Sequence, residues 1–533
     1  MSAPAENLEE QTLQATIPCV DPATGERLGE VPAMSPPEVR EQIARARHAQ
    51  REWGATSFDE RRRVLRRLLD MLLEHADALC DEICRDAGKT LHNAMIGEIW
   101  PLAEKLRWTI KEGEKHLRPE RVSSGLLQHK RASIEFHPLG VIGVITPWNF
   151  PLQNILGPTI PALFAGNAVV VKVSEWTSWS VGPFQDFLDR WLKDCGYSPD
   201  LVRLVTGYGD AGAALVSGGV DKIVFTGSMA NGRRVVEESA KTLTPVILEL
   251  GGKDPMIVCD DADLDQAAHA AVSASFIASG QMCLAAERVL VFDRVYDEFV
   301  AKVQDITLRL RQGAPLSGKL VDLGAMTMPA QIEIIEALVA DAVDKGAKLV
   351  TGGKRAKRKP SKQYFEPTLL TEVTEDMRIM HEETFGPVMA VTRVKNEAEA
   401  VRIANATEYG LSASVFSRDR VRARRIADQI VAGSTCINDW ALMYMVQDLP
   451  FGGVKGSGYG RLNGREGLRA CTNNKAVIED RLPFHRAIEM FPSRRFDYEV
   501  TREGVRLLYA SKISDKADAL VKLGRALLDR AKS

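Results

Sequence analysis

The sequence has no long apolar run and almost no net charge, and these two absences exclude two classes of protein. None of its 533 residues lies in a stretch close to the roughly twenty uninterrupted apolar residues that a membrane-spanning helix needs. The 69 basic and 71 acidic residues leave a formal net charge of -2, which provides no general attraction to nucleic acid. We therefore expect neither a membrane span nor a nucleic-acid partner.

Cysteine is also scarce: the eight residues form no CxxC pair and have no histidine at metal-ligand spacing. This pattern indicates free thiols in a reducing compartment and no metal site. The amino-terminal segment MSAPAENLEEQ is polar and acidic, and it lacks the basic start and the apolar core of a secretory signal. We expect a cytoplasmic protein in which any one of the eight cysteines could be a nucleophile.

The residues that are present are typical of a large globular protein, with 45% hydrophobic and 26% charged residues of mixed sign. A chain of this length exceeds one hydrophobic core, so we expect two or three packed units. The first third is expected to be helical, because Ser57 and Glu60 have the Ser-x-x-Glu capping-box spacing before a periodic apolar run at residues 64–83.

From residue 141 the pattern changes to short apolar runs separated by helix-length segments, namely VIGVI, AVVVKV, LVRLVT, KIVFTG and VILEL. This alternation predicts a parallel sheet with helical crossovers, as in a doubly wound nucleotide-binding unit. A second alternating stretch, residues 256–447, contains the strand RVLVFD and helices at residues 264–280 and 329–347, and it predicts a separate α/β domain. The basic run at residues 354–362 contains a proline and no aromatic residue, so we expect an exposed loop.

Two glycine-rich turns compete for the role of a dinucleotide site. Residues 207–212, GYGDAG, match G-x-G-x-x-G, but the next strand ends in Thr-Gly where an acidic residue is expected, so we favour a structural turn. In FTGSMANGRRV, Gly227 and Ser228 lie between a strand and a probable helix start, where backbone amides and a hydroxyl can hold a pyrophosphate. A tight βα turn explains the second motif equally well.

Two charged residues follow the buried strand AVVVKVSE at the carboxyl edge where open α/β sheets bind ligands. Lys172 and Glu175 can hydrogen-bond the hydroxyls of an adenosine ribose there. Without further context, two solvated residues at a strand end would be the favoured interpretation.

Three residues could carry chemistry. Cys283, in ASGQMCLAAERVLV, lies between an apolar helix and a strand, although most cysteines are small buried hydrophobes. Glu249 interrupts the apolar strand VILEL, and burial would raise its pKa toward that of a general base, the alternative being an ion pair inside the fold. Asn149 follows the strand VIGVI between two prolines, where its amide could stabilise an oxyanion or serve only the turn.

The motifs TPWNFP, VKVSE, FTGS, LELGG, GQMCLAAER, EETFGPV, NDW and LPFGGVKGSGYGR occur in the order found in the aldehyde dehydrogenase superfamily, and the chain resembles this family over residues 21–480. Each motif alone is weakly specific, whereas the ordered set is highly specific. The usual KPSE reads KVSE here, with Val173 in place of proline. Together with HKRASIEFHPLGVIGVI and EGLRAC, this departure resembles the branch that contains the plant family 22 aldehyde dehydrogenases.

The resemblance implies roles for particular residues. Cys283 would be the nucleophile, Glu249 the base, and Asn149 the oxyanion donor, assisted by the backbone N–H of Cys283. The implied cofactor contacts are Thr146, Pro147, Trp148, Lys172, Ser174, Glu175, Gly227, Ser228, Gly251, Gln331, Glu383 and Phe385. The implied substrate pocket comprises Asn154, Met282, Leu284, Tyr444 and Met445. The implied reaction oxidises an aldehyde to a carboxylate through a thiohemiacetal and then a thioester on the cysteine.

The resemblance also implies a domain organisation. The fold would contain two doubly wound α/β domains, one for the cofactor and one for catalysis, with a small β arm for oligomerisation. The implied boundaries are residues 1–119 and 139–250 for the NAD(P)-binding domain, 251–450 for the catalytic domain, 120–138 and 465–480 for the arm, and 481–533 for a C-terminal extension. A homodimer or homotetramer is expected, because the family pairs its subunits through such arms.

The C-terminal extension ends in a predicted amphipathic helix. One face carries Ala517, Leu520, Val521, Gly524, Leu527 and Leu528, and Lys and Arg lie opposite. We favour a helix packed on its own subunit or on an oligomer partner over an anchor at a membrane surface.

The cofactor and the substrate are less sharply specified. Glu175 favours NAD, because a carboxylate near the adenosine ribose repels a 2′-phosphate, although NADP is possible if this side chain swings away. The predicted substrate pocket contains no fixed cation, so we expect an uncharged aldehyde. Two other functions remain open: a binding protein that has lost turnover, which the intact catalytic residues argue against, and ester hydrolysis by the same cysteine.

Overall fold

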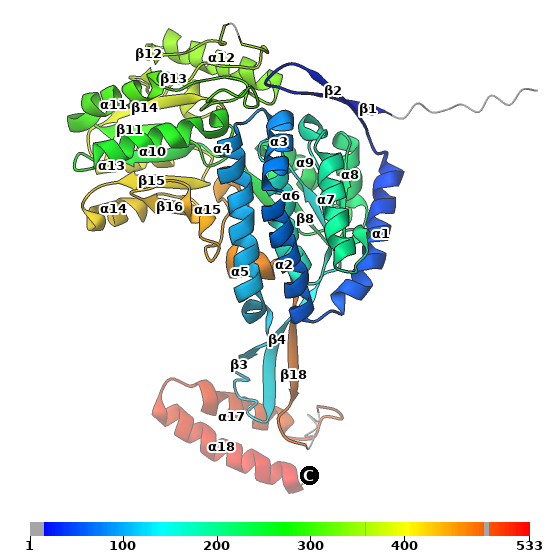
Figure 1. Cartoon of the computed structure of the whole chain (residues 1–533). Coiled ribbons are helices and arrows are strands. Elements are labelled where there is room, and N and C mark those ends of the chain that lie inside the picture. Colours follow the sequence, from blue (N-terminus) through cyan, green and yellow to red (C-terminus); the bar gives the residue numbers. More distant parts are fainter. Residues whose placement is uncertain (1–14, 358, 484–489, 533) are drawn as a thin grey trace, which may run out of the picture. The chain divides into compact units, whose positions relative to one another are not determined.

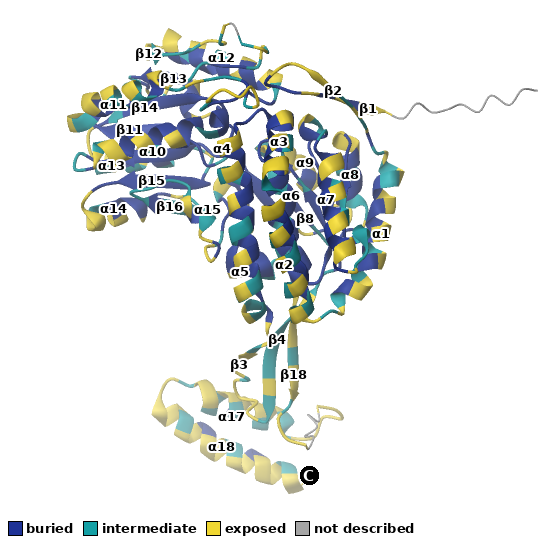
Figure 2. Ribbon diagram, in the orientation of Figure 1, coloured by how far each residue is buried: buried dark blue, intermediate teal, exposed yellow. Residues whose placement is uncertain are grey.

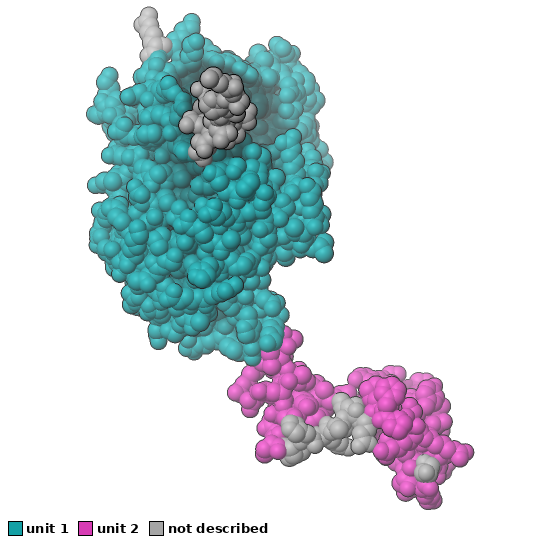
Figure 3. Space-filling model, turned by 90° about the vertical axis from the view of Figure 1, so that its right-hand side faces the viewer, with its two compact units in different colours: residues 1–120, 134–475 teal, residues 121–133, 476–533 magenta. Residues whose placement is uncertain are grey.

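The computed structural model describes residues 15–357, 359–483 and 490–532 (Figure 1). The chain forms two compact units, which Figure 3 shows in teal and magenta. Unit 1 comprises residues 1–120 and 134–475, and unit 2 comprises residues 121–133 and 476–533.

The first sheet of unit 1 has six strands in the order β17-β9-β8-β5-β6-β7. Five neighbouring strands run parallel, and the short β17 joins β9 in the antiparallel direction. The strands are β5 (Val141–Ile145), β6 (Ala168–Lys172), β7 (Val202–Val205), β8 (Lys222–Gly227), β9 (Val246–Leu250) and β17 (Gly458–Tyr459). The helices of this part are α1 (Pro36–Gly54), α2 (Phe58–Glu74), α3 (Ala76–Ala87), α5 (Trp100–Leu117), α6 (Pro151–Phe164), α7 (Val181–Asp194), α8 (Gly209–Ser217) and α9 (Met229–Ser239).

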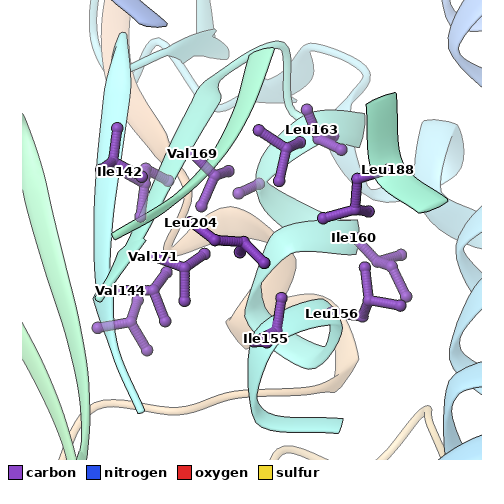
Figure 4. Close-up of a cluster of buried hydrophobic side chains, with 14 of the residues drawn as sticks. Ile142, Val144, Ile155, Leu156, Ile160, Leu163, Val169, Val171, Leu188 and Leu204 are labelled. Atoms are coloured by element: carbon purple, nitrogen blue, oxygen red, sulfur yellow. The ribbon is translucent and has the colours of Figure 1, made fainter. Parts of the chain in front are cut away.

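The core of this part forms where β5, β6 and β7 face α6 and α7 (Figure 4). A central parallel strand is covered on both faces, which explains why the sequence shows continuous β-branched runs and no polar alternation. The strand AVVVK is buried at every position. The side chains that meet in Figure 4 are Ile142, Val144, Val169, Val171 and Leu204 from the strands and Ile155, Leu156, Ile160, Leu163 and Leu188 from the helices.

The second sheet of unit 1 has seven strands in the order β12-β13-β14-β11-β10-β15-β16, and only the β12–β13 pair is antiparallel. The two sheets confirm the predicted pair of doubly wound α/β units. The strands are β10 (Asp254–Val258), β11 (Ala286–Phe292), β12 (Lys348–Thr351), β13 (Thr368–Thr371), β14 (Val388–Val394), β15 (Ser412–Phe416) and β16 (Ser434–Ile437). The helices are α10 (Leu264–Phe276), α11 (Tyr296–Leu308), α12 (Pro329–Asp344), α13 (Glu397–Asn405) and α14 (Arg420–Ala427).

Shorter elements complete the fold. A two-stranded sheet pairs β1 with β2, and a three-stranded sheet has the order β18-β4-β3. These elements are β1 (Thr16–Val20), β2 (Arg27–Pro32), β3 (Glu120–Val122), β4 (Lys130–Pro138), β18 (Thr472–Asp480), α4 (Leu91–Ala94), the π-helix η1 (Met95–Ile99), α15 (Leu442–Met445) and α16 (Gly464–Arg469). Single 3-10 turns are η2 (Glu175–Thr177), η3 (Pro199–Leu201), η4 (Ile277–Gly280), η5 (Asp293–Val295), η6 (Arg378–Met380) and η7 (Lys455–Ser457).

Three predicted helices have different bounds in the structure, and the helix predicted over residues 329–347 ends at Asp344. The run at residues 64–83 is divided at His75, whose backbone angles of φ -110° and ψ 12° end α2 and begin α3. The helix predicted over residues 264–280 ends at Phe276, because Ala278 and Ser279 adopt left-handed φ angles of 50° and 57°. The buried N–H of Ala278 donates to Asn93 Oδ1 at 3.0 Å and thereby satisfies this irregular backbone.

Unit 2 contains a helical hairpin formed by α17 (Asp497–Tyr509) and α18 (Ile513–Lys532). Ala519 and Ala526 are buried on α18, and the buried carboxylate of Glu503 on α17 pairs with two arginines of its own helix. All six residues of the predicted apolar face of α18 are exposed. The helix does pack on its own subunit, as predicted, but its buried residues are Ala519 and Ala526 and not those of the predicted apolar face. No described helix is both long and apolar enough to cross a membrane.

Candidate active site

Unit 1 contains a cavity of about 890 Å³ that collects the residues singled out from the sequence. The three predicted catalytic residues, the twelve predicted cofactor contacts and the five predicted substrate-pocket residues all line it. The strands β5, β6, β8 and β9 contribute residues at or just beyond their carboxyl ends, the edge at which open α/β sheets bind ligands. The structure thus brings together residues that are up to 299 positions apart, from Thr146 to Met445.

Cys283 differs from the other seven cysteines of the chain in being partly exposed, whereas those seven are buried. It follows the irregular segment after α10, and the N–H of Ala285 donates to the carbonyl of Met282 at 3.0 Å to close a turn around it. Burial of the sulfur and the adjacent Glu249 carboxylate both hold the pKa of the Cys283 thiol well above its ordinary value.

Gln281 fixes the loop that carries this cysteine. Its amide nitrogen donates to the carbonyl of Ala278 at 2.9 Å, and its side-chain oxygen accepts from the N–H of Thr327 at 2.8 Å. Its own carbonyl accepts from Asn149 Nδ2 at 3.0 Å. The Asn149 amide is therefore held against the backbone two residues before Cys283, and both residues line the cavity.

Asn149 is positioned by a buried ion pair that the sequence did not reveal. Lys89 Nζ donates to the carbonyl of Asn149 at 2.6 Å and to Glu98 Oε1 at 2.8 Å. The other oxygen of Glu98 accepts from the N–H groups of Leu152 at 2.7 Å and Gln153 at 3.1 Å, the first turn of α6. The only available signal was a carboxylate within the apolar helix pattern IGEIW, the same kind of signal that singled out Glu249.

Glu249 lies on β9 with only 3% of its surface exposed. Burial raises the pKa of this carboxyl to about 7. Within the described chain its Oε1 atom has no hydrogen-bond partner, although buried polar atoms nearly always have one. A carboxylate that has one oxygen without a partner in the described chain and a pKa near neutrality is suited to take a proton from a water molecule at the adjacent cysteine.

One end of the cavity has the features of an adenosine and pyrophosphate site. Lys172 Nζ lies 3.3 Å from Glu175 Oε2, and burial lowers the pKa of this lysine. Ser228 caps the eleven-residue helix α9 by accepting from the N–H of Asn231 at 3.3 Å. Gly227 and Ser228 line the cavity, whereas none of residues 207–212, all of which are described, does so. This placement agrees with the choice of FTGS over GYGDAG.

The neighbouring part of the cavity is shaped by Glu383 and Phe385. Glu383 Oε1 accepts from the N–H of Gly252 at 3.0 Å, and burial and the nearby Glu287 carboxylate raise the pKa of Glu383 to about 8. A Cβ atom on Gly251 would lie 2.3 Å from this carboxylate, so a larger residue at this position would displace the Glu383 side chain. The rings of Phe385 and Trp148 meet edge to face, with centroids 5.4 Å apart. The carboxylate and the two aromatic rings together fit a nicotinamide riboside.

A second buried ion pair holds this segment in place. Glu287 accepts from the N–H groups of Thr384 at 2.7 Å and Phe385 at 2.8 Å, and it also pairs with Lys253. Gln331 donates from its amide nitrogen to the carbonyl of Thr384 at 2.8 Å. In the sequence, Glu287 is simply the first charged residue after the cysteine. No local pattern shows that its side chain reaches a backbone segment almost a hundred residues away.

The far end of the cavity is apolar and aromatic. Met282, Leu284, Tyr444 and Phe451 belong to one hydrophobic cluster, and the rings of Tyr444 and Phe451 meet edge to face at 4.9 Å. The Tyr444 hydroxyl also bonds to the Gln153 amide. The ionisable acidic and basic side chains that line the whole cavity, apart from the cysteine and tyrosines, are Lys172, Glu175, Glu249, His381, Glu382, Glu383, Glu408 and Asp439.

Comparison with known proteins agrees with this geometry. Residues 8–477 match the aldehyde dehydrogenase family. The chain is 41% identical to an aldehyde dehydrogenase-like protein of Schizosaccharomyces pombe over 88% of this chain and 90% of that protein. It is 37% identical to the NADP-dependent succinate-semialdehyde dehydrogenase of Deinococcus radiodurans over 86% of this chain and 94% of that protein.

The fold matches a crystal structure of betaine aldehyde dehydrogenase from Staphylococcus aureus in complex with NAD+, with a TM-score of 0.82 and 30% identity. The match covers 90% of this chain and 94% of that chain. The narrower resemblance to the plant family 22 branch stays a prediction. On the family match, the extent of the relatives and the shared fold, this chain belongs to the aldehyde dehydrogenase family of NAD(P)-dependent oxidoreductases.

Proposed function

We propose that this chain oxidises an uncharged aldehyde to the carboxylate with NAD, and that Cys283, Glu249 and Asn149 perform the chemistry. The observation that carries this proposal is the placement of the one partly exposed cysteine beside a buried carboxylate and a fixed amide on one cavity wall. Nucleophile, base and oxyanion donor are the three groups that acyl transfer through a thioester requires.

The reaction begins when the Cys283 thiolate attacks the aldehyde carbon and forms a thiohemiacetal. Asn149 Nδ2 and the backbone N–H of Cys283 donate hydrogen bonds to its oxyanion. When bound, NAD(P) would supply the acceptor for the hydride of the thiohemiacetal, whose loss would leave a thioester on Cys283. The Glu249 carboxylate then takes a proton from a water molecule, whose oxygen adds to the thioester carbon and releases the carboxylic acid and the thiolate.

The cofactor would lie along the residues that line the other part of the cavity. Lys172 and Glu175 would bind the adenosine ribose, and Ser228 at the start of α9 would bind the pyrophosphate. Glu383 would bind the nicotinamide ribose beside Phe385. The remaining contacts would be Thr146, Pro147, Trp148, Ser174, Gly227, Gly251 and Gln331.

Replacing Glu175 by glutamine is expected to raise the ratio of kcat/KM for NADP to that for NAD by about tenfold, because the amide keeps the shape of the side chain and removes the charge that repels a 2′-phosphate. Initial rates with each cofactor at a fixed aldehyde concentration measure the ratio. Glu237→Gln, which removes an exposed charge from α9, is the matched control and should leave it unchanged. If Glu175→Gln and the wild type have the same ratio of kcat/KM for NADP to that for NAD, the Glu175 carboxylate does not lie beside the adenosine ribose.

The substrate class follows from the charges of the cavity. The apolar end contains Met282, Leu284, Tyr444, Asn154 and Met445. Asp439, which is close in sequence to Tyr444 and Met445, adds a negative charge to the cavity lining. The two basic residues of the lining, Lys172 and His381, belong to the proposed cofactor part. A carboxylated aldehyde would lose its hydration in this site without a cation to compensate.

An aldehyde panel tests this proposal. We expect kcat/KM for hexanal or benzaldehyde to exceed that for succinate semialdehyde by at least about tenfold, as measured by the absorbance of the reduced cofactor. A preference for succinate semialdehyde would contradict the proposed substrate class. Absence of cofactor reduction with every aldehyde, together with hydrolysis of an activated ester, would instead favour a hydrolytic function for the same cysteine.

The cellular setting and assembly are part of the proposal. All eight cysteines are unpaired, which supports a reducing, cytoplasmic location. We propose that residues 1–119 and 139–250 form the NAD(P)-binding domain and residues 251–450 the catalytic domain, each built on one of the two sheets. The three-stranded sheet of β3, β4 and β18 would form the arm of residues 120–138 and 465–480 that joins subunits into a dimer or tetramer.

A further inference from the structure

The two units of the chain have opposite formal charges. Unit 2 contains 15 Lys and Arg residues against nine Asp and Glu residues, a net charge of +6. Unit 1 contains the other 54 basic and 62 acidic residues, a net charge of -8. The near-neutral total therefore conceals a small basic unit attached to a large acidic one, an asymmetry that is typical of a unit that meets an anionic surface.

Both long helices of unit 2 consist mainly of exposed residues (Figure 2), and several of these residues are apolar. On α18 the exposed fraction reaches 86% for Ile513, at the amino-terminal end of the helix. We call these side chains the hairpin face; its members on α18 are Ile513, Leu520, Val521, Leu527 and Leu528, and its members on α17 are Tyr498, Val505, Leu508 and Tyr509.

The hairpin face is a consequence of how the two helices pack. Ala519 and Ala526 lie seven residues apart and turn one side of α18 toward α17. Leu520 and Leu527 each follow an alanine by one residue, and Val521 and Leu528 follow by two, so that a step of about 100° per residue turns them away from the helix contact. Single exposed apolar residues are common in proteins, whereas a repeated apolar stripe on both helices of a hairpin marks an interaction site.

We propose that unit 2 docks the protein on the surface of a lipid bilayer that contains anionic lipids, with the hairpin face in the interface. Amphipathic helices with basic residues beside an apolar stripe bind membranes in this way, because the apolar side chains enter the acyl boundary and the basic groups reach the headgroups. Lys516, Lys522 and Arg525 lie within the same turns as the stripe on α18. The exposed aromatic rings of Phe491, Tyr498 and Tyr509 are of the type that favours the headgroup level.

The charge of unit 2 favours a bilayer over the same unit of a second copy as the occupant of the hairpin face. Two copies joined face to face would bring two units of net charge +6 together, which is electrostatically unfavourable. Anionic headgroups would instead neutralise the basic residues. Because no described helix can cross a membrane, the contact is at the surface. The docking is independent of the proposed catalytic chemistry.

Vesicle flotation of the full-length protein tests the proposal. We expect the protein to float with vesicles of equimolar phosphatidylcholine and phosphatidylserine, and to remain at the bottom with phosphatidylcholine alone. The triple variant Leu520→Gln, Val521→Gln, Leu528→Gln removes apolar area without changing charge and should lower the bound fraction by at least about tenfold. The triple variant Lys512→Gln, Lys516→Gln, Arg525→Gln keeps the stripe and should lower binding to the same vesicles.

A matched control replaces three equally exposed apolar residues of unit 1: Leu308→Gln, Leu320→Gln and Val421→Gln. This control should bind like the wild type. Circular dichroism and aldehyde oxidation of each variant confirm that the chain is folded. Failure of the wild type to bind either vesicle, or binding that the stripe variant leaves unchanged, would overturn the proposal. A lower molecular mass of the stripe variant in sedimentation, without vesicle binding by the wild type, would assign the hairpin face to a second copy.

Discussion

Aldehyde oxidation is expected to fall by a factor on the order of 10⁴ or more when Cys283 is replaced by alanine, because the thioester cannot form without its sulfur. Cofactor binding should survive, since the adenosine and pyrophosphate contacts come from other elements of the cavity wall. Steady-state rates and titration of the protein with NAD, followed by tryptophan fluorescence, measure the two properties separately. The expected pattern is loss of kcat with an unchanged Kd for NAD.

Cys195→Ala is the matched control, because it removes the same group from a buried cysteine of the first hydrophobic core. We expect this variant to keep most of its activity and to lose stability by an amount typical of a small buried truncation. Substantial dehydrogenase activity in Cys283→Ala would assign the nucleophile to another residue. Loss of activity in both variants would indicate damage to the fold rather than to the chemistry.

The second large effect is expected for Glu249→Gln. The amide keeps the size of the side chain and cannot accept a proton from water, so hydride transfer should proceed once and hydrolysis of the thioester should slow by about 10²- to 10⁴-fold. A burst of one equivalent of reduced cofactor per active site, followed by slow turnover, is the kinetic result. Mass spectrometry of the intact protein should show the acyl group on the chain.

The raised pKa of Glu249 gives the wild type a related pH dependence. The carboxylate is the reactive form. The rate of deacylation should therefore be maximal at pH values above the Glu249 pKa of about 7, and it should decline as the pH falls through this value. Glu249→Gln should lack this decline. Glu408→Gln, which alters an exposed carboxylate on the rim of the same cavity, should retain both the turnover and the pH profile. A full turnover rate in Glu249→Gln would exclude this residue as the base.

Local patterns in the sequence were sufficient to predict the five parallel strands of the first sheet, but not the short antiparallel β17. The runs VIGVI and VILEL are observed as β5 and β9 without change of bounds, because a central parallel strand must be apolar on both faces. Helix ends were harder to predict. The stop of α10 at Phe276 depends on left-handed backbone at Ala278 and Ser279, which is stabilised by Asn93 from another part of the chain. A single-sequence pattern contains no information on that partner.

The candidate site divides in the same way. Cys283, Glu249 and Asn149 could be proposed from residue types and motif order, whereas the two ion pairs that position their surroundings could not. Lys89 and Glu287 act on backbone groups 60 and 98 residues away respectively, so that only the folded chain reveals the contacts. Long-range hydrogen bonds of this kind leave no periodicity in the sequence.

The small net charge of the whole chain is the sum of two opposite charges in the folded protein, +6 in unit 2 and -8 in unit 1. The amino-acid sequence by itself determined the family, the order of the motifs and the amphipathic character of residues 513–532. Only the tertiary structure decided that a compact unit of net basic charge is set apart as unit 2. It also decided that α18 buries two alanines and leaves its leucines exposed. The physical reason is that side-chain spacing fixes which residues share a helix face, while packing against a partner helix decides which face is buried.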